Sequence, residues 1–344
     1  MLKRLFWFSG LLVLMVVGAS LWLFQQLERT LEAPIPLNEP QVLEIEQGTW
    51  FRKFAVQLEQ RGIVQSHLWL RLAAQFNPEV TAIKAGEYQI EPGMSLRQLL
   101  DNVVSGKTIS YTFTLIEGTT YKQLRQSLLS NDQLKHELGD MSEALLLDQL
   151  GSDAPSVEGL FLAETYHFTR GMTDLQLLQR AHEDLKQVLE EAWSRRAKDL
   201  PYKTPYEALI MASIIEKETA VPAERGQISG VFVRRLKRGM RLQTDPTVIY
   251  GMGERYKGNI TRADLRRPTP WNTYVIDGLP PTPIALVGRD AVEAALNPVD
   301  GKSLYFVAKG DGSHHFSNTL QEHNRAVRQY QLKRRADYRS SPEN

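Results

Sequence analysis

The feature that most constrains this chain is an uncharged apolar run from Leu5 to Phe24, which follows Lys3 and Arg4. A helix rises about 1.5 Å per residue, so the run spans roughly 30 Å, the thickness of one bilayer core. A cationic flank favours the cytoplasmic side, so we expect the N-terminus inside the cell and the rest of the chain across the membrane. In a bacterium this predicts a single-pass protein of the inner (cell) membrane that faces the periplasm.

A cleaved signal peptide is the alternative, because the small residues at 17–19 resemble a cleavage site. Apolar residues continue beyond that site to Phe24, however, and Trp22 suits a membrane interface. We therefore expect residues 1–24 to form a short cytoplasmic end and a retained anchor. The spaced prolines that follow predict an extended stalk over residues 25–40.

The remaining composition is that of an ordinary globular protein. Of the 344 residues, 42% are hydrophobic, and a formal net charge of +1 gives no reason to expect nucleic-acid binding. Cysteine is absent, which excludes disulfides, thiol nucleophiles and zinc–thiolate sites. His314, His315 and His323 lack the helical pair and acidic partner of a zinc-protease motif. We therefore expect neither a metal nor a cofactor.

A short motif recurs at residues 43–49, 88–95 and 115–120. Each copy combines a predicted strand, a glycine turn and a hydroxyl residue placed to cap a helix. Two strands and two helices with apolar stripes predict a small α/β module over residues 41–112. This module resembles the LysM-like modules that bind glycans containing N-acetylglucosamine, and a structural spacer remains the alternative.

The best-defined helix start in the sequence is at Pro205. Thr204 can cap the helix, proline fits its first turn, and Glu207 completes a capping box. The helix is expected to continue to Thr219. At about 100° per residue, Glu218 lies on the same face as the apolar side chains of Ile210, Met211, Ile214 and Ile215.

Glu218 is therefore an acid in a position where apolar packing is expected. Partial desolvation disfavours the charged carboxylate and raises its pKa, which makes Glu218 a candidate proton donor near neutral pH. By the same geometry Glu216 and Lys217 are expected to point to solvent. The alternative is that Glu218 only ends the helix, as the ion-pair partner of Lys217 or Arg225.

Three later segments are rich in polar residues at turn positions, at 242–251, 270–274 and 278–284. Together with Glu158-Gly159 and the segment Ser213–Thr219, they resemble the YceG-like family of endolytic peptidoglycan transglycosylases. The resemblance extends from the anchor to about Tyr330. It is specific, because the Leu-Gln-Thr-Asp-Pro-Thr string and the Gly-Leu-Pro-Pro string occur in the order that the family has.

This resemblance implies that Glu218 is the catalytic residue. It also implies cleavage, without water, of the β-1,4 bond between N-acetylmuramic acid and N-acetylglucosamine, which leaves a 1,6-anhydro end and terminates a nascent strand. Wall synthases would then be partners. Candidate substrate-binding residues are Gln243, Thr244, Asp245, Asn272 and Tyr274, for which roles in turns or in the core remain open.

The sequence thus predicts an α+β protein with one membrane helix, a LysM-like module, a mixed α/β catalytic domain over residues 113–335 and a polar tail over residues 336–344. Two other functions remain open. One is a membrane-tethered protein that binds peptidoglycan without cleaving it. The other is a muramidase that uses water, which would need a second carboxyl group in its site.

Overall fold

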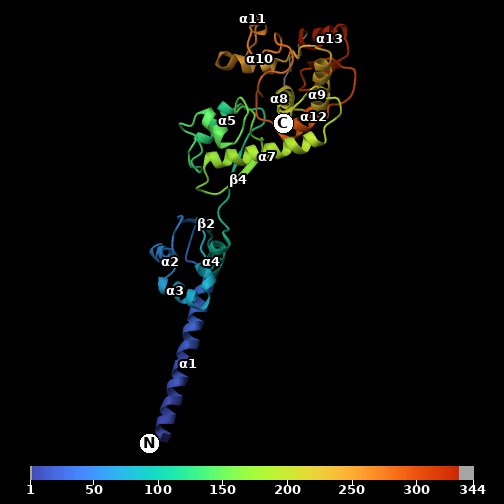
Figure 1. Ribbon diagram of the computed structural model, residues 1–344. Coiled ribbons are helices and arrows are strands. Elements are labelled where there is room, and N and C mark those ends of the chain that lie inside the picture. The colour runs from blue at the N-terminus through green and yellow to red at the C-terminus, as the bar shows by residue number, and fades with distance from the viewer. Residues whose placement is uncertain (1, 333–344) are drawn as a thin grey trace. The chain divides into compact units, whose positions relative to one another are not determined.

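The structure, a computed structural model, describes residues 2–332, which form two compact units (Figure 1). Unit 1 contains the chain up to Tyr111 together with His167–Gly171, and unit 2 contains Thr112–Tyr166 and the chain from Met172 onward. Both helices and strands occur, which confirms the predicted α+β class. The polar tail predicted for residues 336–344 lies outside the described residues.

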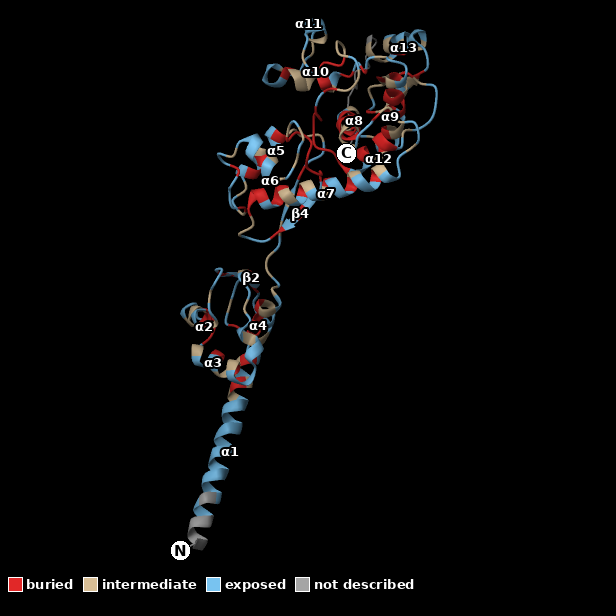
Figure 2. Cartoon of the chain, viewed as in Figure 1, coloured by how far each residue is buried: buried red, intermediate tan, exposed pale blue. Residues whose placement is uncertain are grey.

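The chain begins with the long helix α1, Leu2–Glu32. Its segment Gly10–Glu32 is long and apolar enough to cross a membrane, and Figure 2 shows most of the helix coloured as exposed. Large side chains such as Trp22, which is 64% exposed, have no protein core to cover them. An apolar helix with this exposure fits a membrane anchor.

The predicted extended stalk differs from the structure at residues 25–32, which continue α1. Leu27 and Leu31 are one helical turn apart, and both are buried in the hydrophobic core of unit 1, as is Ile35. Arg97 adds ion pairs to Glu28 at 2.6 Å and to Glu32 at 2.5 Å. The prolines therefore act only beyond the helix, and the anchor helix continues directly into the first folded unit.

Unit 1 is built around an antiparallel pair of strands, β1 (Gln41–Ile45) and β2 (Gly86–Ile90), in which Leu43 lies opposite Tyr88. Around them pack helices α2 (Phe51–Gln60), α3 (His67–Phe76) and α4 (Leu96–Ser105) and a 3-10 turn at Pro78–Thr81. Helix α3 and the 3-10 turn exceed the predicted two strands and two helices. The likeness to LysM-like modules stays a prediction.

Two short strands, β3 (Tyr111–Thr114) and β4 (Thr165–Phe168), pair with each other and contain two of the points at which the chain passes from one unit to the other. In unit 2, Thr114 and Thr165 join their hydroxyl groups at 2.9 Å. The amide of Leu115 donates to the carbonyl of Glu164 at 3.0 Å. These bonds fix the start of unit 2 beside a segment some fifty residues later.

The regular secondary structure of unit 2 is mainly helical. Its helices are α5 (Tyr121–Leu129), α6 (Glu143–Gln149), α7 (Asp174–Ser194), α8 (Pro205–Glu218), α9 (Pro222–Lys237), α10 (Asp245–Met252), α11 (Arg262–Arg266), α12 (Arg289–Leu296) and α13 (Leu320–Val327). A 3-10 turn spans Gly253–Arg255, and a π-helical turn spans Arg328–Leu332. The antiparallel strands β5 (Tyr305–Ala308) and β6 (His314–Ser317) complete it.

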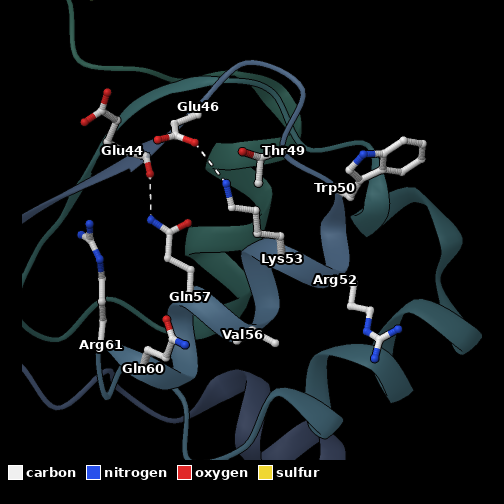
Figure 3. A pocket seen from close by; sticks show the side chains of 10 residues that line it. All are labelled: Glu44, Glu46, Thr49, Trp50, Arg52, Lys53, Val56, Gln57, Gln60 and Arg61. Carbon is white, nitrogen blue, oxygen red and sulfur yellow. Dashed lines mark hydrogen bonds and ion pairs between the residues drawn. The ribbon is translucent and has the colours of Figure 1, made fainter.

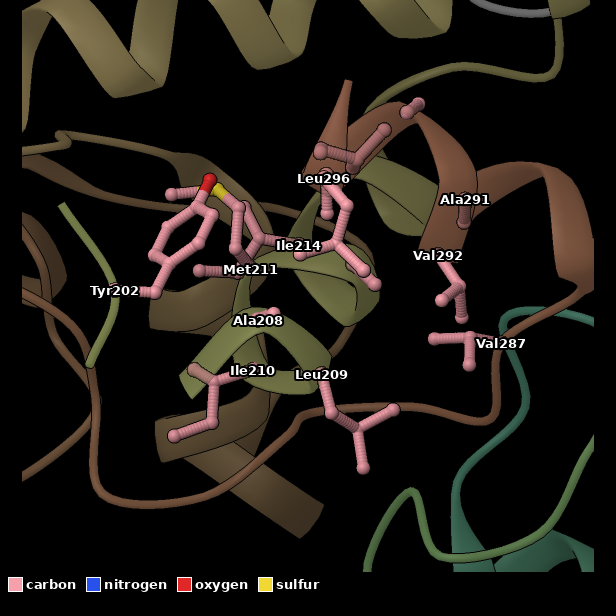
Figure 4. Packing of buried hydrophobic residues seen from close by; sticks show 14 of the residues in the cluster. Tyr202, Ala208, Leu209, Ile210, Met211, Ile214, Val287, Ala291, Val292 and Leu296 are labelled. Carbon is pink, nitrogen blue, oxygen red and sulfur yellow. The ribbon is translucent and has the colours of Figure 1, made fainter. Parts of the chain in front are cut away.

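Helix α8 lies at the centre of unit 2, in contact with α7, α9, α10 and α12. All eight residues from Ala208 to Ile215 are buried, and Figure 4 shows Met211 and Ile214 packed among side chains from the surrounding segments, including Leu296. A helix that is apolar on every side is held by neighbours all round. Its C-terminal end, where the acids lie, is thereby fixed in a rigid frame.

Candidate active site

The start of α8 follows the prediction at Thr204. Its side chain accepts a hydrogen bond from the amide of Glu207 at 3.2 Å, and Pro205 is the first helical residue. The Glu207 carboxylate bonds to the amide of Lys203 rather than to that of Thr204. The helix ends at Glu218, with Thr219 as its C-cap in an extended conformation. Chain direction therefore changes directly after the acid.

Glu218 is half-buried on the wall of a cleft of about 410 Å³ in unit 2. Its Oε1 accepts a hydrogen bond from the hydroxyl of Thr244. Burial raises the pKa of Glu218 to about 7, and the nearby charge of Asp245 acts in the same direction, while the Thr244 hydrogen bond opposes both. A carboxyl group with this pKa can give up and take back a proton near neutral pH.

Neither Lys217 nor Arg225, the two ion-pair partners considered from the sequence, pairs with Glu218. Lys217 Nζ donates to the carbonyl of Gly118 at 2.8 Å. Arg225 instead pairs with Glu216 at 3.1 Å, and the Glu216 side chain is only 4% exposed. The expectation that Glu216 points to solvent was therefore wrong, because α9 and the chain at Gly288 cover that face of α8. Of the two C-terminal acids of α8, Glu218 is the one that lines the cleft.

Thr244 is held in position by a network of buried hydroxyl groups. Its amide donates to Thr273 Oγ1 at 3.0 Å, and its carbonyl accepts from Thr247 Oγ1 at 2.8 Å. The hydroxyl groups of Thr247 and Thr273 are also 2.8 Å apart. The sequence analysis missed Thr247 and Thr273, although each lies within three residues of a predicted site residue. The network orients the Thr244 hydroxyl toward Glu218.

Gln243, Asp245 and Tyr274 also line the cleft beside Glu218. The Tyr274 hydroxyl donates to Asp245 Oδ1 at 2.6 Å. Burial, together with the negative charge of Asp245, raises the pKa of Tyr274, which therefore stays protonated and can keep donating. Gln243 has a positive φ of 51°, and its amide donates to the carbonyl of Thr273 at 3.2 Å. The backbone of Gln243 is therefore in an unfavourable conformation, which its hydrogen bond to Thr273 helps to hold.

Asn272, the remaining predicted binding residue, does not line the cleft. It is 1% exposed, and its amide nitrogen donates to the carbonyls of Asp264, Leu265 and Arg267 at 2.8–3.2 Å. Its side-chain oxygen accepts from the amide of Tyr274 at 3.0 Å. All of its hydrogen bonds therefore hold the loop together, and the loop role that the sequence left open is the one its contacts support.

The cleft is also lined by residues of β5, β6 and α13. His314 bonds to Glu224 through both its amide, at 2.9 Å, and its ring nitrogen Nδ1, at 2.7 Å. His323 stacks on Tyr305 with ring centroids 5.2 Å apart. Among the described residues, no group of three or more metal-ligating side chains comes together. The histidines thus belong to the cleft wall.

Another buried acid with a raised pKa, Glu158, lies outside this cleft. Glu158 is 5% exposed and accepts from the amide of Tyr121 at 2.9 Å and from the hydroxyl of Tyr250 at 3.1 Å. Burial raises the pKa of Glu158 to about 7, against the effect of these hydrogen bonds. It connects α5 to α10, whose first residue is Asp245. Its contacts are those of a positioning residue.

Comparison with known proteins gives consistent matches. Residues 43–329 match the model of the YceG-like family. A Bacillus subtilis protein named endolytic murein transglycosylase is 29% identical over 337 residues, which cover 92% of this chain and 91% of that protein. A Streptococcus pneumoniae protein of the same name is 28% identical over 334 residues, which cover 86% of this chain but only 60% of the longer relative.

A solved structure of a yceG-like protein has a similar fold. The crystal structure of a yceG-like protein from Listeria monocytogenes superimposes with a TM-score of 0.54 at 29% sequence identity. The match covers 84% of this chain and 99% of that one.

Proposed function

Because the chain belongs to the YceG-like family, we propose that it is an endolytic lytic transglycosylase of peptidoglycan. The two relatives named endolytic murein transglycosylase support this activity. The proposed reaction breaks the β-1,4 bond between N-acetylmuramic acid and N-acetylglucosamine inside a strand. It leaves a 1,6-anhydro end and so terminates elongation of that strand.

Glu218 is proposed to serve both steps of this reaction. As the protonated acid it donates to the leaving glycosidic oxygen while positive charge develops on the sugar ring. As the resulting carboxylate it accepts the proton of the muramoyl C6 hydroxyl group, which attacks the same anomeric carbon and closes the anhydro ring. The observation that carries the proposal is a half-buried carboxyl group with a pKa of about 7 on the wall of the cleft.

The neighbouring groups suit this cycle. The Thr244 hydroxyl bonds to Glu218 and thereby stabilises the carboxylate that the first step produces. Gln243, Asp245 and Tyr274 are proposed to position the sugar, since they line the same cleft. The substrate supplies its own nucleophile, so no second catalytic carboxyl group is needed.

A muramidase is the second candidate, because Asp245 brings a second carboxyl group into the cleft. In that reaction Asp245 would activate water or attack the sugar itself. Its hydrogen bond from Tyr274 favours a fixed orienting role instead. The two reactions give products that differ in mass by one water molecule.

The test uses the full chain in detergent with purified peptidoglycan, beside its Glu218→Gln variant. We expect anhydro-ended fragments from the wild type and intact strands from the variant, with binding retained. Asp245→Asn removes the other carboxyl group of the cleft and tests the muramidase, since it should still release anhydro-ended fragments if Glu218 alone carries the chemistry. Hydrolysed ends from the wild type would establish the muramidase, and intact strands from the wild type would favour a protein that only binds.

The location of the enzyme is proposed from α1. With Lys3 and Arg4 before the apolar segment, the N-terminus is cytoplasmic and both units lie outside the inner membrane. There the enzyme would work beside wall synthases, which make the strands it cuts. Protease added to spheroplasts should degrade both units, and full protection would contradict this orientation. In-cell crosslinking that captures no synthase would contradict the partnership.

Unit 1 is proposed to hold the glycan strand. A shallow pocket of about 680 Å³ beside α2 carries Trp50, which is 82% exposed, and polar side chains including Glu46, Lys53 and Gln57 (Figure 3). An exposed aromatic ring with hydrogen-bonding neighbours suits the apolar face and hydroxyl groups of a sugar. We expect Trp50→Ala to weaken sedimentation with peptidoglycan severalfold and Leu68→Ala, another exposed apolar residue, to leave it unchanged. Equal sedimentation of both variants would refute the assignment.

A further inference from the structure

A second groove, lined by arginines, lies next to the catalytic cleft in unit 2. It has a volume of about 490 Å³ and is lined by Arg241, Arg262, Leu265, Arg266, Tyr274 and Val275. Tyr274 lines both this groove and the cleft that contains Glu218. A ligand in one is therefore in contact with the wall of the other. The mechanism proposed above makes no use of the three guanidinium groups.

Two of the arginines are available for a ligand. Arg262 and Arg266 are four residues apart on α11, so they lie on the same side of the helix, and both are exposed. Among the described residues, no carboxylate pairs with either of them. The acid nearest in sequence, Asp264, is occupied at the helix start by the amide and hydroxyl of Thr261, at 3.0 and 2.6 Å. The groove therefore carries uncompensated positive charge.

The third arginine, Arg241, is held in place by two hydrogen bonds. Arg241 Nε donates to Asp277 Oδ1 at 2.9 Å, and its Nη1 donates to the carbonyl of Tyr274 at 3.1 Å. Asp277 neutralises part of its charge. Arg241 also stands three residues before Thr244, which bonds to Glu218. This part of the groove is thus continuous with the segment that orients the acid.

Asn272 ties α11 to the cleft. Its amide nitrogen holds the carbonyls of Asp264, Leu265 and Arg267, and its oxygen holds the amide of Tyr274. The arginines of α11 are therefore held at a fixed distance from the loop that forms the cleft. A substrate that extends beyond the cleft meets a preformed anion site rather than a mobile surface.

We propose that this groove binds the carboxylates of the peptide stem on the muramic acid residue that enters the cleft. This inference rests on the proposed function, because a peptidoglycan strand carries such an acidic peptide on the lactyl group of each muramic acid. Guanidinium groups bind carboxylates with two parallel hydrogen bonds, whereas a neutral sugar offers no charge to them. The groove would thus select strands with intact, charged stems and set which sugar lies at Glu218.

The test compares two substrates that differ only in charge. One is peptidoglycan with its native stems, and the other is the same material with stem carboxyl groups converted to amides by carbodiimide and ammonia. The ratio of the two cleavage rates is measured for the full-length wild type, for Arg262→Gln/Arg266→Gln, and for Lys237→Gln/Arg238→Gln. The last pair removes two exposed charges from the end of α9, outside the groove.

We expect the wild type and the α9 variant to cleave native strands roughly tenfold faster than amidated ones at low salt, from two charge-assisted contacts at an exposed site. The groove variant should show a ratio near one. A wild-type ratio near one, or the same ratio in all three proteins, would overturn the proposal.

Binding measurements separate this proposal from the catalytic one. N-acetylmuramoyl peptide, its amidated form and inorganic pyrophosphate are each titrated into the wild type and the groove variant by calorimetry. Of the three ligands, we expect only the charged muramoyl peptide to bind the wild type. It should bind the groove variant roughly tenfold more weakly. Both results are expected even if the protein cleaves no peptidoglycan. Preferential binding of pyrophosphate would refute the peptide assignment in favour of phosphate recognition.

Discussion

Replacing Thr244 by valine removes the hydroxyl group that donates a hydrogen bond to Glu218, with little change in side-chain volume. Thr244 is 2% exposed, and its backbone contacts to Thr273 and Thr247 do not need its own hydroxyl group. The hydrogen bond stabilises the charged carboxylate, so its loss raises the pKa of Glu218 further above about 7.

The size of the change follows from the strength of that bond. A hydrogen bond to a charged group contributes about 1.5–3 kcal/mol, and one pKa unit corresponds to about 1.4 kcal/mol. Because water in the cleft can replace part of the contact, we expect a rise of about one unit. The acid then stays protonated to a higher pH. The alkaline limb of kcat/KM, which reports the free enzyme, should move up by about one pH unit.

The assay is the pH dependence of release of anhydro-ended fragments at low substrate concentration. Thr114→Val is the control, since it removes a hydroxyl group of unit 2 that bonds to Thr165 and lies outside the cleft. Its alkaline limb should coincide with that of the wild type. A limb that stays in place or moves down in Thr244→Val would refute the assignment that the Thr244 hydrogen bond lowers the pKa of Glu218.

Three further predictions concern stability, measured by urea unfolding. The pKa of Glu218 rises from 4.5 to about 7 on folding, so ionisation weakens the fold as pH increases through that window. Glu218→Gln should therefore be more stable than the wild type at pH 8 by about 1–2 kcal/mol, allowing for solvent in the cleft, and equal at about pH 4, below the unfolded pKa; equality at both would contradict this. Arg225→Met leaves Glu216 buried without its cation and should cost about 3–5 kcal/mol, while a loss below about 1 kcal/mol would show that the pair is unimportant. Asn272→Ala removes three donated hydrogen bonds and should cost about 2–3 kcal/mol, whereas Asn272→Ala with unchanged stability would refute its loop role.

Local signals were sufficient to predict α8 and its start. Thr204 caps the helix, and Pro205 begins it, because both effects depend only on neighbouring residues. The predicted apolar face was too narrow, however, since α8 is buried on every side. Glu216 is covered by Arg225 and by the amide of Gly288, which is 72 residues away in sequence. Burial by residues this far away in sequence cannot be predicted from the spacing of apolar residues along one helix.

The beginning of the chain shows the opposite case, in which a local signal was present and went unused. Leu27 and Leu31 continue the helical spacing beyond the apolar run, and they are buried in unit 1. The stalk was predicted to begin too early on account of the prolines at 34, 36 and 40. A proline restricts its own backbone and that of the residue before it, and it has no effect on a helix that ends at Glu32.

The predicted binding residues divide according to where their hydrogen bonds go. The residues that line the cleft with Glu218 are Gln243, Thr244, Asp245 and Tyr274. The side chain of Asn272 instead makes its hydrogen bonds within its own loop. The sequence alone does not distinguish an asparagine that forms a turn from one that binds substrate. Only the positions of Asp264 and Arg267, whose carbonyls accept from Asn272, distinguish the two roles.

The most direct test of the central claim, that Glu218 cleaves the glycan without water, is to run the reaction in water labelled with heavy oxygen. The mass of the new muramoyl end is then read by mass spectrometry. A lytic transglycosylase closes the ring with the substrate's own C6 hydroxyl group, so we predict an end that carries no label and is lighter than a hydrolysed end by one water molecule. An end that contains one labelled oxygen would contradict the account and make the protein a muramidase.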